Sequence, residues 1–443
     1  MAETNTEHEI EHEIEHETET ETEFETGTGT EAGVEQEPVA APRPARRREL
    51  WLSVAVAAVV LSAGGFVTFG LTRPVPAPRI VQTVAQTYAI PGAAPVLPWP
   101  KAGQAAVDVD GFGRVGTSGG SRPVPIASVA KVMTAYLILR DHPLRPDEDG
   151  PTLTVSAEEA ATYPSQFASG ESVVRVVAGE TLTEREALVA LLLPSANNIA
   201  HILARWDAGD EAAFVTRMNQ AAAQLGMANT HYTDPSGLDA ATVSTAADQA
   251  TLGRLAMQMP VFAQIVAMPQ ATLPVVGPVS NVNTQLYQDG IIGIKTGFTD
   301  DAGGCLLFAA EISAEGHRYK VIGAVLAPGP NMTDAFEAAR RLIQASGGLL
   351  HRYRVVGAGD VVATVQGPMG RSTTLVPGGD VTVLGWPGLT YRMETLGSVR
   401  GRIAAGAGVG TLRLTASDTA VTAALQATHT LKPPSQWERI THV

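Results

Sequence analysis

Hydrophobic and polar positions in the middle of the chain change their period several times. Residues 105–109 and 113–117 alternate across an Asp-Gly turn, which predicts a β-hairpin. The apolar positions of residues 126–265 have mostly helical spacing, whereas residues 290–327 are typical of strands. These patterns predict a domain of mixed α/β structure.

The period changes again towards the C-terminus. Residues 334–345 have the spacing of an amphipathic helix. From about residue 353 short Val- and Leu-rich runs alternate with glycine turns, as in 361–365, 381–384 and 410–414. Such runs predict strands, and together they indicate a small, separate all-β domain.

A long uncharged run near the N-terminus predicts a membrane span. Residues 51–71 carry no charge, and 21 residues at about 1.5 Å each reach about 31 Å, enough to cross a hydrocarbon core. Four arginines at 43 and 46–48 precede the run, against Arg73 and Arg79 after it, which places the N-terminus in the cytoplasm. A cleaved signal peptide is the nearest alternative, but the run is longer than a usual signal and no convincing A-x-A site follows. We therefore expect residues 51–71 to cross the lipid bilayer, with everything beyond about residue 73 outside the cytoplasm.

The acidic charge of the chain is confined to its first residues. Residues 1–40 hold 14 Glu and no other charged side chain, and the rest of the chain has 31 acidic and 31 basic residues. No basic face indicates a nucleic-acid partner. Self-repulsion and few apolar groups predict a disordered tail. Two overlapping H-E-x-x-H sequences, at residues 8–12 and 12–16, arise from a four-residue repeat, and we do not interpret them as a zinc site.

Composition shifts suggest the domain boundaries. Seven prolines lie between residues 73 and 100, which is typical of a stiff spacer. The predicted parts are a disordered acidic cytoplasmic tail that ends in the arginine cluster (1–49), a transmembrane helix (50–72), a Pro-rich linker (73–96), the mixed α/β domain (97–350) and a small β-rich domain (351–443).

The first chemical motif is Ser128-Val129-Ala130-Lys131. Ser128, Lys131 and Thr134 form one polar stripe on an otherwise apolar helix, which predicts a buried central helix. Burial lowers the pKa of a lysine, so Lys131 could take the hydroxyl proton of Ser128 and activate a nucleophile. This is the only Ser-x-x-Lys in a chain with five lysines. The alternative is that Lys131 merely reaches the surface.

Two further motifs follow in the chain. Ser195-Ala196-Asn197 comes directly after Pro194, where a helical run must break, and Ser195 could equally be a helix cap. Lys295-Thr296-Gly297 ends an apolar run, where an edge strand would present its polar groups to an anionic ligand. The third motif could also be an ordinary turn at the end of a strand.

The three motifs, in this order and separated by 67 and 100 residues, fit the set Ser-x-x-Lys, Ser-x-Asn and Lys-Thr-Gly. Residues 97–350 resemble a low-molecular-weight penicillin-binding protein of the D-alanyl-D-alanine carboxypeptidase family (serine peptidase family S11). The resemblance implies a penicillin-binding or β-lactamase-like serine acyl-enzyme fold. It extends over segments around the motifs, namely 125–127, 226–231, 234–238, 244–248, 289–299 and 302–305.

The resemblance also implies a role for each site residue. Ser128 is the nucleophile that attacks the carbonyl between two D-alanines, Lys131 is its base, and Ser195 relays a proton to the leaving amine. The substrate-binding residues are Asn197, Lys295, Thr296, Gly297 and Phe298. Backbone N–H groups of Ser128 and Phe298 would form the oxyanion hole. Peptidoglycan stem peptides would be the substrates, β-lactams would acylate the same serine, and no cofactor or metal is implied.

The sequence departs from the family at two positions. Asn198 stands where many members have an aspartate after the second motif, which keeps hydrogen bonding but removes a charge. The segment 328–334 has no arginine, although members often carry one there that binds the substrate's terminal carboxylate. Cys305, the single cysteine, follows the family pattern, and we expect a small buried residue there.

Two alternative functions share this fold. A β-lactamase would need a glutamate on a loop between the second and third motifs, and the only glutamate between Asn198 and Gly290 is Glu211, inside a predicted helix. An inactive wall-binding protein would not need to keep all three motifs. We therefore predict a membrane-anchored D-alanyl-D-alanine carboxypeptidase.

Overall fold

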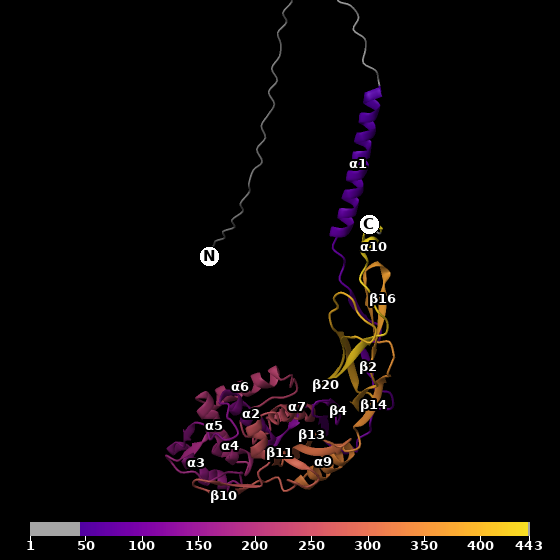
Figure 1. The fold of residues 1–443 in the computed structure, drawn as a ribbon. Coiled ribbons are helices and arrows are strands. Elements are labelled where there is room, and N and C mark those ends of the chain that lie inside the picture. Colours follow the sequence, from indigo (N-terminus) through magenta and orange to yellow (C-terminus); the bar gives the residue numbers. More distant parts are fainter. Residues whose placement is uncertain (1–44, 442–443) are drawn as a thin grey trace, which may run out of the picture. The chain divides into compact units, whose positions relative to one another are not determined.

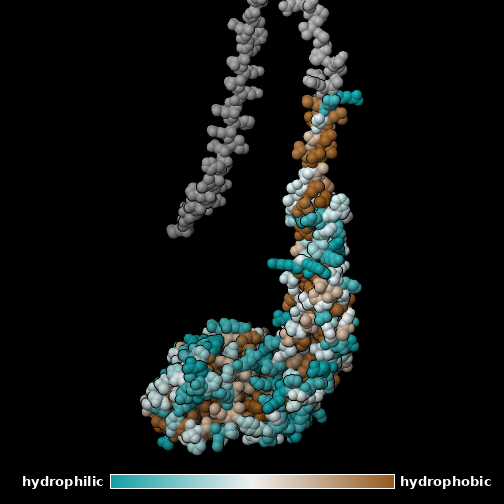
Figure 2. Space-filling view, viewed as in Figure 1, coloured by the Kyte–Doolittle hydropathy of each residue, from teal (hydrophilic) through white to brown (hydrophobic). Residues whose placement is uncertain are grey.

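A computed structural model describes residues 45–441, which form two units: the N-terminal helix α1 and the part from Arg73 to Arg439. Helix α1 (Ala45–Thr72) contains a stretch, Arg48–Thr72, long and apolar enough to cross a membrane. Its hydrophobic side chains are exposed, and Figure 2 shows much of it in brown. Ser53 and Thr68 bond back to carbonyls four residues earlier, so their hydroxyls are paired within the helix. Residues 1–44, which include both H-E-x-x-H sequences, lie outside the described residues, whereas residues 45–49 of the predicted disordered tail are helical and begin α1, so the prediction is wrong for them.

The larger unit is built around a five-stranded antiparallel sheet with strand order β11-β12-β13-β3-β4. The predicted hairpin is confirmed, because residues 105–109 pair with residues 113–118. The strands are β3 (Gln104–Val109), β4 (Gly113–Ser118), β11 (Ile291–Thr299), β12 (Gly303–Ala314) and β13 (His317–Leu326).

Helices cover both faces of this sheet (Figure 1). Helix α9 (Met332–Ser346) packs on one face against Leu306, Phe308 and Val325. Leu307 and Ile322, which alternate with those residues, face the larger helical layer. That layer contains α2 (Lys131–Asp141) after the 3₁₀ turn η1 (Ala127–Ala130), α4 (Glu184–Leu192), α5 (Asn197–Ala208), α6 (Glu211–Gln224), α7 (Ala246–Ala256) and α8 (Pro260–Val266).

Short elements connect the helices of this layer. They are β5 (Val124–Pro125) paired with β8 (Val243–Ser244), β6 (Thr152–Thr154) paired with β7 (Thr181–Thr183), β9 (Gln270–Leu273) paired with β10 (Gly277–Ser280), and helix α3 (Ala157–Ala168). Helix α3 begins with a capping box of Ser156 and Glu159, and none of its residues is fully buried.

The C-terminal region is rich in strands, as its Val- and Leu-rich pattern predicts. Its strands are β14 (His351–Val356), β15 (Ala363–Gln366), β16 (Ser372–Pro377), β17 (Val381–Gly385), β18 (Thr390–Leu396), β19 (Gly408–Ala416) and β20 (Thr419–Ala427). A single turn η2 (Pro368–Gly370) and the short helix α10 (Gln436–Thr441) complete it. Strand β14 pairs with β17. The other five strands join β1 (Arg79–Gln82) and β2 (Thr87–Ala89) in a seven-stranded sheet with the order β1-β15-β16-β20-β19-β18-β2.

The spacer prediction for residues 73–96 is wrong for part of that segment. Strand β1 (Arg79–Gln82) pairs with β15, and β2 (Thr87–Ala89) pairs with β18, so both join the C-terminal sheet. The prolines lie on either side of residues 79–90, and this proline-free stretch carries Ile, Val, Thr and Tyr residues that favour strands.

Candidate active site

The first motif lies where η1 passes into α2. Ser128 is in the 3₁₀ turn, Lys131 begins the helix, and Lys131 Nζ lies 2.7 Å from Ser128 Oγ. Residue 127, directly before the serine, has a φ of 47°, a left-handed conformation that is costly for alanine and is typical of functional sites. The predicted buried helix is confirmed, and the Lys131 side chain does not reach the surface.

Burial changes the chemistry of Lys131. The pKa of its amine is well below the usual range, first because burial disfavours the charged form and second because Lys295 lies nearby. Asp234 and Glu171 oppose this shift with their negative charges. A neutral amine within hydrogen-bond distance of a serine hydroxyl can accept its proton.

The second motif meets the first at the same amine. Lys131 Nζ lies 3.4 Å from Ser195 Oγ and 2.6 Å from Asn197 Oδ1. Ser195 has a φ of 66°, and the N-cap of α5 is Ala196, so Ser195 is not the cap of this helix. The turn at Pro194 instead directs Ser195 Oγ towards the amine.

The third motif approaches from the sheet. Strand β11 is at the edge, as predicted, and Lys295 and Thr296 are almost completely buried in it. A Cβ at Gly297 would lie 2.9–3.1 Å from Ile126 O and the backbone nitrogens of Ser128 and Val129, so only glycine lets the strand come this close to η1. Burial lowers the pKa of Lys295 to about 7, and its Nζ donates to the carbonyl of Thr296 at 3.0 Å. Phe298 is half exposed.

Three further residues at this site lie outside the three motifs, although Thr134 belongs to the polar stripe of the first. Thr134 Oγ1 donates to Pro235 O at 2.6 Å, which ties α2 to the loop 234–238. Asp234 in that loop and Glu171 in segment 169–180 are the two carboxylates whose charges act on Lys131. Asp234 belongs to a segment that the family resemblance singles out, whereas nothing in the periodicity around Glu171 distinguishes it.

The Asn198 side chain uses both ends of its amide to bind the backbone of Val174. Its Oδ1 accepts from Val174 N at 3.2 Å, and its Nδ2 donates to Val174 O at 2.8 Å. An aspartate could accept the first bond but could not donate the second. The side chain therefore pins the loop 171–177 to the start of α5.

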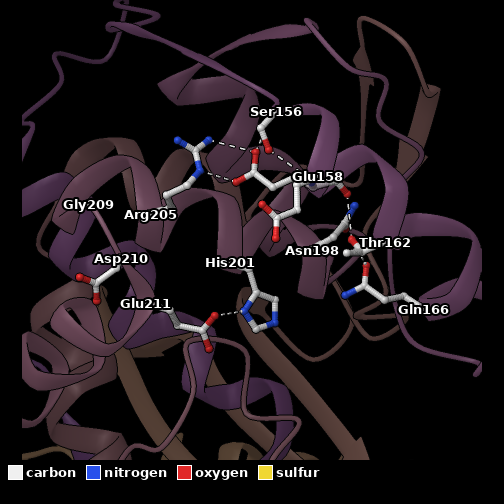
Figure 3. Close-up of a pocket in the computed structure, with 11 residues that line it drawn as sticks. Ser156, Glu158, Thr162, Gln166, Asn198, His201, Arg205, Gly209, Asp210 and Glu211 are labelled. Carbon is white, nitrogen blue, oxygen red and sulfur yellow. Dashed lines mark hydrogen bonds and ion pairs between the residues drawn. The ribbon is translucent and has the colours of Figure 1, made fainter.

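A groove of about 490 Å³ lies beyond Asn198, between α3, α5 and the start of α6 (Figure 3). Arg205 pairs with Glu159 in it, and His201 Nδ1 lies 2.7 Å from Glu211. None of the residues of the three motifs lines this groove, so it is separate from the site around Ser128.

The single cysteine has no part in the site, and the described residues offer no cluster of metal-ligating side chains. Among residues 45–441 no group of three or more His, Cys, Asp or Glu side chains is placed to hold an ion. Cys305 is buried, and burial raises the pKa of its thiol to about 11, so the thiol stays protonated and unreactive.

Comparison with known proteins agrees with this geometry. Residues 105–327 match the family described as D-alanyl-D-alanine carboxypeptidase. A D-alanyl-D-alanine carboxypeptidase of Mycobacterium tuberculosis is 38% identical over 226 residues, which cover 47% of this chain and 70% of that protein. A D-alanyl-D-alanine endopeptidase of Pseudomonas aeruginosa is 35% identical over 197 residues, which cover 43% of this chain and 60% of that protein.

Solved structures share the fold over a larger part of the chain. Penicillin-binding protein 5 of Haemophilus influenzae is 20% identical, with a TM-score of 0.54, over 77% of this chain and 99% of that chain. The D-alanyl-D-alanine carboxypeptidase of Francisella tularensis is 21% identical, with a TM-score of 0.53, over 79% of this chain and 98% of that chain.

Proposed function

Because this chain belongs to the D-alanyl-D-alanine carboxypeptidase family of serine peptidases, we propose that it removes the terminal D-alanine from peptidoglycan pentapeptides. The observation that carries the proposal is the convergence of Ser128, Ser195 and Asn197 on one buried amine, Lys131 Nζ, within 2.6–3.4 Å. A buried lysine with a lowered pKa and a serine at hydrogen-bond distance are the parts that acyl transfer requires.

The reaction proceeds in two steps. Lys131 accepts the proton of Ser128 Oγ while the oxygen attacks the carbonyl between the two D-alanines. The backbone N–H groups of Ser128 and Phe298 stabilise the negative charge on the carbonyl oxygen. Ser195 passes a proton to the leaving amine, which releases D-alanine and leaves an ester on Ser128. Water then hydrolyses the ester and frees the shortened peptide.

The remaining motif residues hold the substrate. The Asn197 amide binds the peptide backbone, and Lys295 and Thr296 receive the terminal carboxylate. Gly297 allows the substrate to lie along β11, as an added strand would. Because residues 328–334 contain no arginine, Lys295 pairs with the substrate carboxylate without a second cation from that segment.

β-Lactams acylate the same serine in this scheme and act as covalent inhibitors. A β-lactamase is disfavoured because the chain has no suitable glutamate between the second and third motifs to drive deacylation. Glu211 is paired with His201 and lines the separate groove beyond Asn198. Inactive wall binding is disfavoured because the catalytic side chains are arranged for proton transfer.

Location and domain division are part of the proposal. Helix α1 anchors the chain in the membrane with the acidic tail (1–49) in the cytoplasm, and the catalytic domain (97–350) lies outside. The arginines at 43 and 46–48, which precede the uncharged run 51–71, support this orientation. Residues 351–443 form the small β domain, to which residues 79–89 add two strands.

A fluorescent penicillin tests the acyl-enzyme directly. The full chain in detergent should become labelled and keep its label, and the Ser128→Ala variant should not. Free D-alanine from a pentapeptide identifies a carboxypeptidase, whereas cleavage of a cross-linked dimer identifies an endopeptidase. An unlabelled wild-type chain would refute the acyl-enzyme, and rapid loss of label would indicate a β-lactamase.

A further inference from the structure

A half-buried carboxylate outside the three motifs lies beside the second one. Glu171 belongs to the irregular segment between α3 and β7, and its Oε2 accepts from Asn197 Nδ2 at 3.1 Å. At the other end of the same amide, Asn197 Oδ1 accepts from Lys131 Nζ at 2.6 Å. One side chain therefore connects Glu171 with the amine at the centre of the site.

This connection fixes the orientation of the Asn197 amide. An ionised carboxylate can only accept hydrogen bonds, so Nδ2 must face Glu171 and Oδ1 must face Lys131. The flipped amide would place its oxygen against the carboxylate and its NH₂ group against the lysine amine. Both contacts would then be unfavourable.

The backbone around Glu171 is docked on the same helix. Asn197 N donates to Ser172 O at 2.7 Å, directly after Glu171. Two residues further on, Val174 exchanges two hydrogen bonds with the Asn198 side chain. The backbone that carries the carboxylate is thus docked at the start of α5, where the carboxylate accepts its hydrogen bond from Asn197.

Charge gives Glu171 a second effect on Lys131. The groups that face the amine are neutral Ser128, Ser195 and Asn197, the cation Lys295 on β11, and the carboxylates of Asp234 and Glu171. Asp234 is already held by hydrogen bonds from Ser236, Leu238 and Thr242. Glu171 is the carboxylate that also touches a residue of the motifs.

We propose that Glu171 is a positioning residue, which orients the Asn197 amide against Lys131 and opposes, at the Lys131 amine, the effect of the positive charge of Lys295. The inference rests on the proposed function, because it assigns Glu171 a part in the acylation of Ser128. Acylation requires neutral Lys131, so its rate rises with pH through the pKa of this amine.

Two substitutions separate orientation from charge. Glu171→Gln keeps an acceptor for Asn197 Nδ2 but removes the charge, and Glu171→Ala removes both. Without the carboxylate the pKa of Lys131 falls further, so Glu171→Gln should move the acid limb of the acylation rate about 0.5–1 pH unit lower. Glu171→Ala should in addition slow acylation about 10-fold at every pH, because the amide can turn. Glu158→Gln, which removes an exposed carboxylate on α3, should match the wild type.

The measurement is the second-order rate of labelling by a fluorescent penicillin against pH, on the full chain in detergent, together with the melting temperature of each variant. Wild-type chain that takes no label would refute the proposed function itself. Labelled wild type with unchanged profiles in both Glu171 variants would refute the role of Glu171 alone. A rate loss with an unmoved acid limb and a lower melting temperature would show a purely structural role and would also overturn it. If Glu171→Ala does not fold, the shift in Glu171→Gln decides.

Discussion

The two buried lysines of the site need opposite protonation states. Lys131 must be neutral to accept the proton of Ser128, and Lys295 must be charged to attract a carboxylate. Burial lowers the pKa of both, and the charge of Lys295 lowers that of Lys131 further. The scheme therefore requires a pH range in which Lys131 is neutral and Lys295 is still a cation, and the charge of Lys295 shifts the pKa of Lys131 in the direction that this needs.

The upper end of that range is a prediction about Lys295. A lysine is cationic below its pKa, so kcat/KM for a peptide that ends in a D-alanine carboxylate should fall as pH rises above about 7. Lys295→Gln should remove this alkaline limb and lower kcat/KM at neutral pH about 10- to 100-fold, mainly through KM. Lys101→Gln, an exposed lysine, serves as the control. An alkaline limb that persists in Lys295→Gln would assign it to another group.

A second residue-level prediction concerns Asn198. Asn198→Asp removes the donor to Val174 O and sets a charge against that carbonyl, so we expect a loss of about 1–3 kcal/mol in the free energy of unfolding. Hydrogen exchange should increase at residues 171–177. Gln220→Glu places a comparable amide-to-carboxylate change on an exposed side chain and should be near neutral. Equal stability of the two variants would contradict the prediction.

At the scale of elements, periodicity predicts those whose apolar faces are buried. The hairpin 105–117, the strands of 290–327 and helix α9 follow directly from spacing, because the strands form the central sheet and α9 packs on it. Strands β1 and β2 were missed because the prolines around them outweigh two short runs, and their partners lie about 280–300 residues away in the chain. Local pattern carries no information on such distant pairing.

The same distinction applies to the site. Ser128 and Lys131 are three residues apart on one turn, so their contact follows from local geometry. The position of Glu171 depends on how an irregular loop docks on α5, and that of Asp234 on a loop tied to α2 through Thr134. Both are consequences of tertiary packing, which spacing along the chain does not encode.

The start of α4 allows a prediction about pH and stability. Glu184, the first residue of this helix, is completely buried, and neither carboxyl oxygen has a hydrogen-bond partner among the described residues. Burial raises the pKa of this carboxyl to about 8, although Arg185 opposes the shift. The folded protein therefore keeps a proton that the unfolded chain loses above about pH 4.5.

This raised pKa sets the sign of the effect. The free energy of unfolding should fall by about 1.4 kcal/mol per pH unit between the unfolded and folded pKa values and level off above the folded one. Glu184→Gln should lack this component, so its stability relative to the wild type should grow from pH 5 to pH 8, roughly. Denaturant unfolding at several pH values measures the difference, with Glu158→Gln as the exposed control. A difference independent of pH would show that Glu184 is ionised in the folded protein.

At the scale of the whole molecule, one segment completes the C-terminal sheet at both edges. Residues 79–82 pair with β15 at one end of the seven-stranded order, and residues 87–89 pair with β18 at the other. Ile90, the next residue after β2, lies in the hydrophobic core that packs on this sheet. The polypeptide that leaves α1 is thus built into the seven-stranded sheet before it reaches the five-stranded sheet.

This arrangement predicts how the chain tolerates truncation. A variant that begins at residue 73 keeps β1 and β2, whereas one that begins at residue 97 exposes the backbone of β15 and β18 and removes Ile90 from its core. The second variant should lose about 3 kcal/mol or more in the unfolding of its β domain and should aggregate on heating. Both variants should still be labelled by penicillin at Ser128. Every strand of the five-stranded sheet and every helix packed on it begins after residue 97, so neither truncation removes any of them. Calorimetry with light scattering separates the two transitions, and identical melting of the two variants would show that the edge strands contribute nothing to stability.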